Sequence, residues 1–184
     1  MRIISLTTFF VFILSTILFS GEKAPQKIVD LANSKLVAHG SNAVIVEAVK
    51  AQNSKGVSLA KIKEQDEKWK ATAGVVDYMK AIMTSECGKY LSKIQKSEKY
   101  YAEIFVMDNQ GANVAMTDKT SDYWQGDEAK FTESFKGGKG GVHISDVEFD
   151  DSSQAYLVQV SVPVKDNGKV IGAITFGIDV DLVK

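Results

Sequence analysis

The stretch VQVSVPVKDNGKVIGAITFGIDVDLV (residues 158–183) decides the fold of this chain. In each half, apolar residues alternate with small or polar ones, and a period of two is the pattern of a β-strand. Asn167–Gly168 stands between the halves, and this dipeptide is typical of tight hairpin turns. The stretch therefore predicts two neighbouring antiparallel strands, at 155–164 and 170–178.

The two faces of this hairpin differ in chemistry. One face of the first strand is a row of large apolar side chains: Tyr156, Val158, Val160, Val162 and Val164. The opposite face carries Gln159 and Ser161, with Thr175 expected beside them on the second strand. A solvated face would more often carry Lys and Glu. An amide and two hydroxyls among small residues are more typical of the floor of a ligand pocket.

The rest of the chain predicts three more strands and a set of helices. Period-two segments at 100–108, 112–117 and 142–149 read as strands. Apolar residues before residue 99 recur at helical spacing, at 26–50, from Ser58 onward and at 73–96, the last broken near Cys87–Gly88. We therefore predict an α+β fold, with a five-stranded antiparallel sheet and helices packed on one face. The helical part is expected at 25–99 and the sheet, with its pocket, at 100–184.

The N-terminal segment 1–21 predicts export. Arg2 gives a short positive region, an apolar run follows at 3–19, and Ser20 and Gly21 are small residues suited to cleavage. An uncleaved membrane anchor is the alternative, because the run approaches the length that spans a bilayer. Cleavage is favoured by the small, weakly charged flank. We expect a periplasmic or secreted protein, anchored by its N-terminus if the segment is not cleaved.

Composition excludes several classes of function. Arg2 is the only arginine, so the rest of the chain has 21 lysines (22 Lys and Arg, less one) against 23 acids. This balance lacks the excess of basic residues that a nucleic-acid-binding surface needs. Cys87 is alone, so no intramolecular disulfide forms. His39 and His143 are far apart in sequence and suggest no zinc site. We expect no metal and no cofactor.

The segment TSDYWQGDE (120–128) raises the question of chemistry. Asp122, Asp127 and Glu128 could serve as catalytic carboxylates of a hydrolase, but nothing in the sequence makes them converge. Tyr123 and Trp124 are better explained as an aromatic wall over the polar face, or as a structural plug at the end of the sheet. No catalytic residue is expected. The residues expected to bind a ligand are Tyr123, Trp124, Asp127, Ser145, Gln159, Ser161 and Thr175.

Two stretches resemble a known family. Both EIFVMDNQGANVAMTDKTSDYWQGDEAKF (103–131) and the segment 158–183 resemble extracytoplasmic Cache sensor domains, also described as PDC or PAS-like domains. The resemblance covers roughly residues 25–184. It implies a long N-terminal helix on one face of a five-stranded sheet and a ligand pocket on the other face. Among partners we also consider a homodimer through the N-terminal helix. Family members usually pass ligand occupancy to a cytoplasmic kinase, cyclase or chemotaxis module.

The chain departs from this pattern in two respects. After GIDVDLVK it shows no second membrane span and no output module, so we expect a free-standing sensor domain that works with a separate membrane receptor or sensor kinase. The amino-acid-binding subset of the family holds the ligand carboxylate with an arginine, which this chain lacks beyond Arg2. An α-amino acid held in that way is not expected, whereas small carboxylates held by backbone or Lys remain open. The alternative function is a structural or interaction module with a vestigial pocket.

Overall fold

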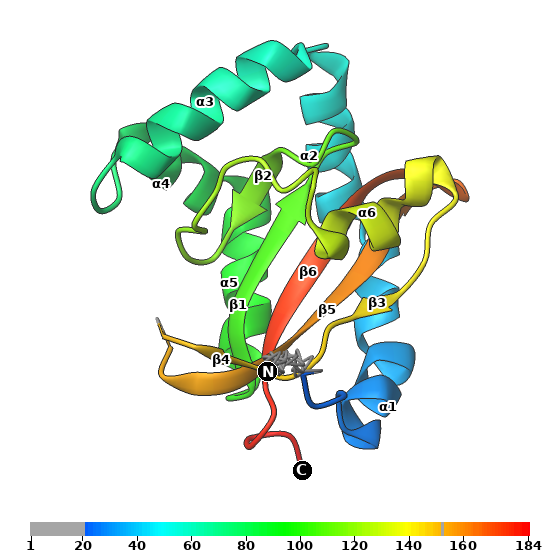
Figure 1. Ribbon diagram of the computed structural model, residues 1–184. Helices are drawn as coiled ribbons and strands as arrows, with labels where there is room; N and C mark the ends of the chain where they lie inside the picture. The colour runs from blue at the N-terminus through cyan, green and yellow to red at the C-terminus, as the bar shows by residue number, and fades with distance from the viewer. Residues whose placement is uncertain (1–20, 152) are drawn as a thin grey trace, which may run out of the picture.

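The computed structural model describes residues 21–151 and 153–184 (Figure 1). The predicted signal peptide at 1–21 lies outside the described residues, apart from Gly21. Within the described ranges, no helix combines the length and the hydropathy needed to cross a membrane.

A single antiparallel sheet forms the centre of the described structure. Its strands are β1 (Tyr101–Met107), β2 (Asn113–Met116), β3 (His143–Ile144), β4 (Glu148–Asp150), β5 (Ala155–Asp166) and β6 (Lys169–Asp179). The order is β2-β1-β6-β5-β3, and β4 also pairs with β5. The β5–β6 turn has φ of 49° at Asn167 and 84° at Gly168. Positive φ at both central residues is what a tight hairpin of the type I′ class requires, so the predicted hairpin is confirmed.

The strand expected at 142–149 is divided into β3 and β4. Both pair with β5, through His143 opposite Ser161 and Glu148 opposite Leu157. Between them the backbone N–H of Gln159 donates to the Ser145 hydroxyl, at 2.9 Å, and not to a carbonyl oxygen. The chain then turns from β5, because Val147 pairs with Glu22 of the N-terminal segment. The prediction of one continuous strand was wrong for this physical reason.

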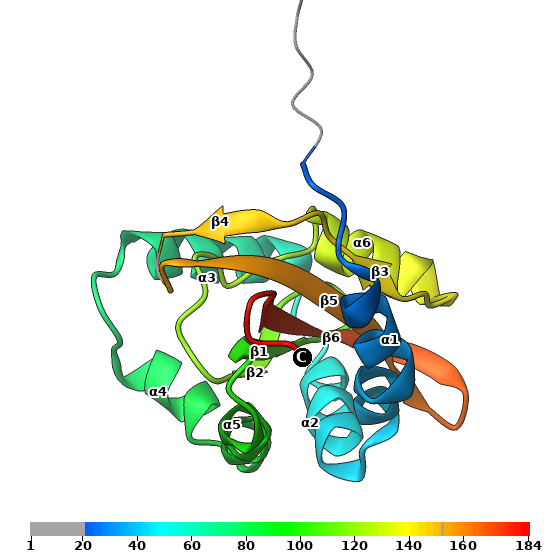
Figure 2. The same ribbon diagram turned by 90° about the horizontal axis from the view of Figure 1, so that it is seen from below.

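Helices cover one face of the sheet, as the valine row predicted (Figure 2). They are α1 (Gln26–Ser34), the 3₁₀ helix η1 (Leu36–Ser41), α2 (Ala43–Ser54) and α5 (Glu86–Ser97). The alternate valines of β5 are fully buried against them, together with Ile174, Phe176 and Ile178 of β6. Gly40 lets η1 lie directly on β5, because a Cβ there would collide with the carbonyl oxygen of Pro163.

Two predicted helices are interrupted where the chain must meet the sheet closely. The helix expected at 26–50 is split by η1, and α2 restarts at the N-cap Asn42, whose side chain accepts from the N–H of Val44. The second break falls between α4 (Asp77–Met83) and α5, before the predicted Cys87–Gly88. Gly88 lies inside α5, where a Cβ would collide with the carbonyl oxygens at the end of α4. This glycine therefore allows a tight corner and does not end a helix.

The opposite face of the sheet carries a second, smaller core. Helix α6 (Ala129–Phe135), followed by η2 (Lys136–Gly138), packs on β5 and β6, and α3 (Leu59–Ala71) arches over β2 (Figure 1). The buried residues of this core are Trp69, Met79, Phe105, Met107, Met116, Phe131 and Ala173. Helices α3 and α6 thus leave the segment 117–128 between them, and this segment borders the cavities described next.

Candidate functional site

Helix α3 holds the backbone of the loop 120–125. Asp66, only 3% exposed, accepts hydrogen bonds at one carboxylate oxygen from the N–H groups of Tyr123, at 2.8 Å, and Trp124, at 3.0 Å. Its other oxygen lies 2.7 Å from the Lys70 ammonium, which also contacts Asp122 at 3.1 Å. These bonds to the two carboxylates raise the pKa of Lys70. The loop is therefore fixed by a charged network on α3 and is not free to swing.

Two indole N–H groups tie the same segment to its neighbours. Trp69 of α3 donates to the backbone carbonyl of Thr120, at 2.8 Å, and is fully buried. Trp124 donates to the carbonyl of Gln110, at 2.7 Å, while the ammonium of Lys63 lies 4.4 Å from its ring centroid. Both contacts use the polar end of an indole to satisfy a backbone carbonyl, as is usual for buried Trp.

The structure separates the two aromatics that were expected to form one wall. Tyr123 turns toward α2 and α3: its ring centroid is 5.6 Å from that of Trp69, and its hydroxyl accepts from the Gln52 amide at 3.3 Å. Trp124 turns to the outer side of the loop, into a small hollow of about 490 Å³ that it shares with Asp127 and the charged residues of α3. These three predicted residues therefore do not converge on the polar face of the sheet.

Ser161 and Thr175 do meet, but they contact each other. Their hydroxyl oxygens are 2.8 Å apart and both residues are fully buried. They stand opposite one another in the β5–β6 register. Neither lines the hollow beside Trp124 or either of the two larger cavities. Each hydroxyl therefore has the other as its hydrogen-bond partner within the sheet.

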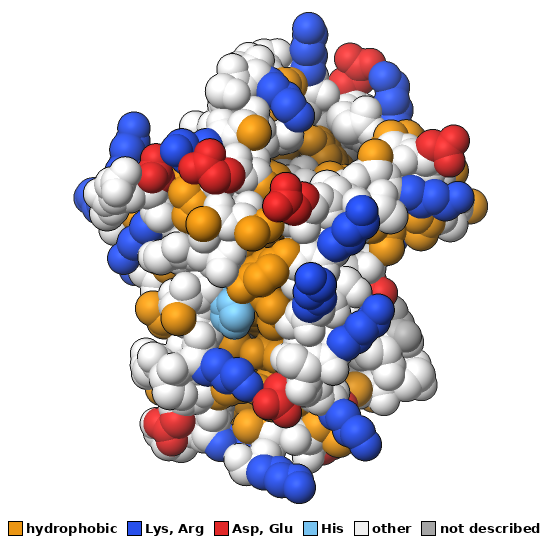
Figure 3. Space-filling view, turned by 180° about the vertical axis from the view of Figure 1, so that it is seen from behind, with side chains coloured by type: hydrophobic (Ala, Val, Ile, Leu, Met, Phe, Trp, Pro, Cys, Tyr) orange, Lys and Arg blue, Asp and Glu red, His pale blue; other side chains and the backbone are white. Residues whose placement is uncertain are grey.

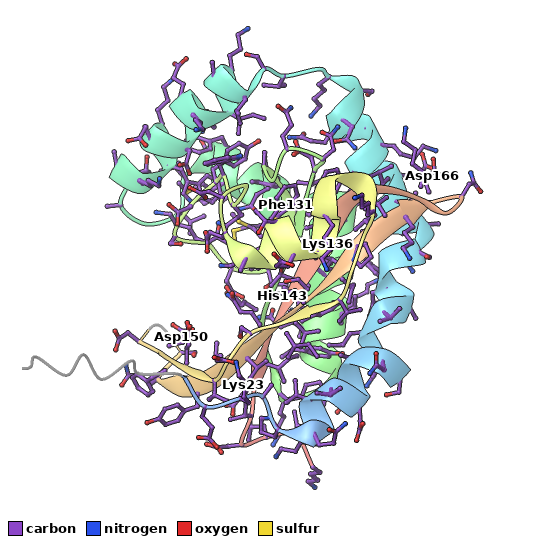
Figure 4. All side chains as sticks on the ribbon, turned by 45° about the vertical axis from the view of Figure 1, so that its right-hand side comes forward. Lys23, Phe131, Lys136, His143, Asp150 and Asp166 are labelled. Atoms are coloured by element: carbon purple, nitrogen blue, oxygen red, sulfur yellow. The ribbon has the colours of Figure 1, made fainter. Side chains whose placement is uncertain are left out.

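Ser145 and Gln159 lie together in a cavity of about 680 Å³ on the face of the sheet opposite α2 and α5. Its walls come from β1, from the loop 119–125, from the start of α6 and from β4 and β5. Figure 4 labels two landmarks, Asp150 on the β4 side of this region and Phe131 on α6 above it. This cavity lies on the polar face, where the strand pattern predicted a pocket.

A carboxylate that the sequence reasoning missed lies in this cavity. Glu103 of β1 accepts a hydrogen bond from the Gln159 amide, at 3.2 Å, and burial raises the pKa of its carboxyl group. Its partner across the sheet is Gly177, where a Cβ would lie 2.6 Å from the Glu103 side chain, so the glycine makes room for the acid. The available signal was a single acid in an otherwise apolar strand, YAEIFVM.

Gln125 adds a second hydrogen-bond acceptor. It is 1% exposed and lines the same cavity. Its Nε2 donates to the backbone carbonyl of Asp122 at 2.7 Å, which orients the amide. Its Oε1 is buried and has no hydrogen-bond partner in the described structure. A buried acceptor without a donor is unfavourable within the fold.

The charge of the cavity is negative. Five acids line it, against two lysines: Glu103, Glu128, Glu148, Asp150 and Asp151, with Lys119 and Lys130. Lys130 is paired with Glu128 at 2.9 Å, and the Lys119 ammonium donates to the carbonyl of Thr72 at 2.6 Å. Within the described ranges, no group of three or more His, Cys, Asp or Glu side chains could hold a metal ion.

An antiparallel sheet with helices on one face and a polar cavity on the other defines an α+β sensor domain of the PAS-like class. The family model described as methyl-accepting chemotaxis protein-like, first PDC sensor domain, matches residues 73–184, which is 112 of the 184 residues. The chain belongs to this family. The resemblance to Cache, or PDC, sensor domains is therefore confirmed, and so is the α+β fold class.

Solved structures of other sensor domains are similar to this chain. The sensor domain of the Vibrio cholerae histidine kinase DctB is 17% identical, with a TM-score of 0.45, over 86% of this chain and 55% of that one. The ligand-binding domain of the Campylobacter jejuni chemoreceptor Tlp3 in complex with L-valine is 15% identical, with a TM-score of 0.41, over 85% and 64%. This chain thus spans less than two thirds of either. No curated protein matches it.

Proposed function

We propose that this sensor domain binds a small molecule carrying a protonated amine, in the cavity between β1, β4, β5 and the loop 119–125. The observation that carries the proposal is the pairing of two acceptors in one cavity: the partly buried Glu103 carboxylate and the Gln125 Oε1 that has no donor. An ammonium group has three donors and a positive charge, and so complements both.

The charge balance supports an amine over an anion. A carboxylate or phosphate ligand would enter among five acids, and each lysine of the cavity already has a partner. No arginine follows Arg2, so no bidentate clamp for an anion is available. We therefore place simple amines ahead of α-amino acids, whose carboxylate would need Lys119 or Lys130 to exchange partners.

The cellular role follows as part of the same proposal. The apolar N-terminal segment supports export to the periplasm or the medium, or anchoring by that segment. In this proposal a membrane receptor or sensor kinase carries the signal across the membrane. A homodimer through the N-terminal helix belongs to this proposal, and no catalytic step is needed.

Thermal-shift and calorimetric titration of the full chain test the proposal. The panel contains primary amines, each beside the alcohol and the carboxylate of the same carbon skeleton. A ligand at 100 times its Kd stabilises the fold by about 2.7 kcal/mol, so binding amines should raise Tm clearly. Glu103→Gln keeps the side-chain shape and removes the charge. It should weaken amine binding roughly 10- to 100-fold, because a charge-assisted hydrogen bond contributes about 1.5–3 kcal/mol.

Glu133→Gln is the matched control. Glu133 is an exposed glutamate of α6 outside the cavity, and its replacement should leave amine affinity unchanged. Selective binding of the carboxylates, or equal amine affinity in Glu103→Gln, would refute the amine assignment. No binding by any compound would favour the interaction module with a vestigial pocket.

A further inference from the structure

One further cavity has no role in the proposal above. It is a cleft of about 910 Å³ between α2, α3, α4, α5 and the edge strand β2. Its walls are mainly small or apolar, and include Ala48, Ala51, Ala81 and Ile82. Seen from behind, hydrophobic side chains lie exposed in a furrow between rims of charged residues (Figure 3). A volume of this size is within the range of sites for small organic molecules.

Aromatic rings form one wall of the cleft. Trp69 lies between Tyr78 and Tyr123, with ring centroids 6.0 Å and 5.6 Å away. Tyr78 remains 42% exposed, whereas Trp69 is fully buried. Tyr123 is fixed by its hydrogen bond to Gln52 on the facing helix. Tyr78 and Tyr123 therefore present flat apolar area to a ligand, with Trp69 packed behind them, and they lose little side-chain entropy on binding because the rings are already held.

Asn113 supplies a polar atom at the floor of this cleft. The residue is 1% exposed and lines the cleft from β2. Its amide nitrogen donates to the Thr120 hydroxyl, at 2.7 Å, and to the carbonyl of Asp122, at 3.1 Å. These two bonds fix which way the amide faces. Its Oδ1 is then a buried acceptor without a hydrogen-bond partner in the described structure. An unpartnered acceptor of this kind is unfavourable unless a donor reaches it.

We propose that the cleft is a second ligand site, for a flat, neutral, mainly apolar molecule with one N–H or O–H donor. The donor pairs with Asn113 Oδ1, and the ring lies along Tyr78 and Tyr123. The charged side chains of the lining, Lys55, Glu47 and Glu86, are of both signs and belong to exposed residues, so they favour no net charge in the ligand. The site shares no ligand-binding residue with the proposed amine site, because it uses neither Glu103 nor Gln125.

A small molecule fits this geometry better than a helix of another chain. Beyond its first turn, a docked helix uses its backbone N–H groups internally, so it would need a long side-chain donor to reach the buried acceptor. A second copy of the chain is the other occupant to test, and it would make the oligomeric state depend on the cleft.

Indole is the probe and 1-methylindole is its matched control. Indole has a ring N–H that can donate a hydrogen bond, whereas 1-methylindole carries a methyl group on that nitrogen and cannot donate. Two-dimensional amide NMR titration of the full chain should show shifts that cluster at Asn113, Tyr123 and the Trp69 indole. Indole should bind roughly five- to tenfold more tightly than 1-methylindole, as the loss of one neutral hydrogen bond implies. Equal affinities, or shifts clustered around Glu103, would overturn the proposal.

Substitutions locate the site. Ala51→Phe or Ala81→Phe fills the cleft from an exposed position and should abolish indole binding, whereas Ala60→Phe, at an exposed alanine of α3 outside the cleft, should not. Glu103→Gln should weaken amine binding but leave indole binding unchanged. The two measurements therefore test the amine site and the cleft separately. Retained indole binding in both blocking variants would refute the proposal. So would a dimer, seen by sedimentation, that Ala51→Phe dissociates.

Discussion

Asp66 accepts a hydrogen bond from the backbone N–H of Tyr123 at 2.8 Å, although the two residues are 57 positions apart. The loop that this bond fixes borders both cavities. Thr120 and Gln125 line the polar cavity over the sheet, whereas Tyr123 lines the apolar cleft. Helix α3 is therefore the element that sets the shape of both candidate sites.

Removal of the Asp66 carboxylate should destabilise the fold. Asp66→Ala leaves two N–H groups without their acceptor and removes one of the two carboxylates that hold Lys70, and we expect a loss of about 2–3 kcal/mol in the free energy of unfolding. Urea denaturation measures this. Glu67→Ala is the control, because Glu67 is exposed and makes a longer contact, of 3.8 Å, with the same Lys70. Its removal should lower the free energy of unfolding by less than about 1 kcal/mol. Similar costs for both variants would show that the network does not hold the loop.

The Ser161–Thr175 pair should matter for stability and not for ligand binding. Each single change, Ser161→Ala or Thr175→Val, leaves one buried hydroxyl unpaired, at a cost of about 1–3 kcal/mol. The double variant should recover part of this loss, with a coupling energy of about 1 kcal/mol in a double-mutant cycle. Its affinity for an amine ligand should equal that of the unsubstituted chain. If the double variant bound the amine more weakly than the unsubstituted chain, the two hydroxyls would belong to the binding site.

Glu103→Gln should stabilise the protein at neutral pH. Burial raises the pKa of Glu103, opposed by Lys130 and by the bond from Gln159. A carboxyl group with a raised folded-state pKa contributes stability that is fully present below its ordinary value of 4.5 and is lost as pH rises through the folded-state pKa. Glutamine avoids this loss. The difference between the two proteins, followed by urea denaturation across pH, should therefore vanish in acid.

The same substitution is expected to weaken amine binding, so stability and function should change in opposite directions at one residue. Such a trade-off is common at binding sites. If Glu103→Gln were less stable than the unsubstituted chain at neutral pH, the carboxylate would be satisfied within the fold and not held for a ligand.

Cys87 should be inert while the chain is folded. Burial raises the pKa of its thiol from 9.0 to about 12, so near neutral pH its thiolate fraction is about a thousandfold lower than that of an ordinary thiol. Since the thiolate is the reactive form, alkylation by iodoacetamide should be slower by a similar factor. The rate should rise to that of a free cysteine when the chain is unfolded in guanidinium. Rapid alkylation of the folded chain would contradict this burial.

Much of the fold could be predicted because its signals are local. The valine row, the Asn167–Gly168 turn and the two faces of β5 all depend on residues close in sequence, and the structure confirms each of them. The division of the strand at 142–149 could not be predicted in this way. It depends on Val147 pairing with Glu22, and the hydrophobic periodicity of neither segment can predict a pairing partner so far away in the sequence.

The candidate site was predictable only in part. The pattern of β5 predicted a polar face, and Gln159 and Ser145 do border a cavity there. Tyr123 and Trp124 are adjacent in sequence but diverge, because Asp66 holds their backbone from one side while Trp69 and Gln110 engage the two rings separately. Glu103 was not predicted, because its place in the cavity depends on the space left by Gly177 of the neighbouring strand.

By itself, the sequence determined the fold class, the central hairpin and the chemistry of each face of the sheet, since hydrophobic periodicity and turn residues act over a few positions. Only the tertiary structure decided which polar groups are satisfied and which are not. Ser161 and Thr175 pair with each other, whereas Gln125 and Asn113 each keep a buried acceptor without a donor. Hydrogen bonding depends on ångström-scale distances between residues far apart in the chain, and packing alone sets those distances.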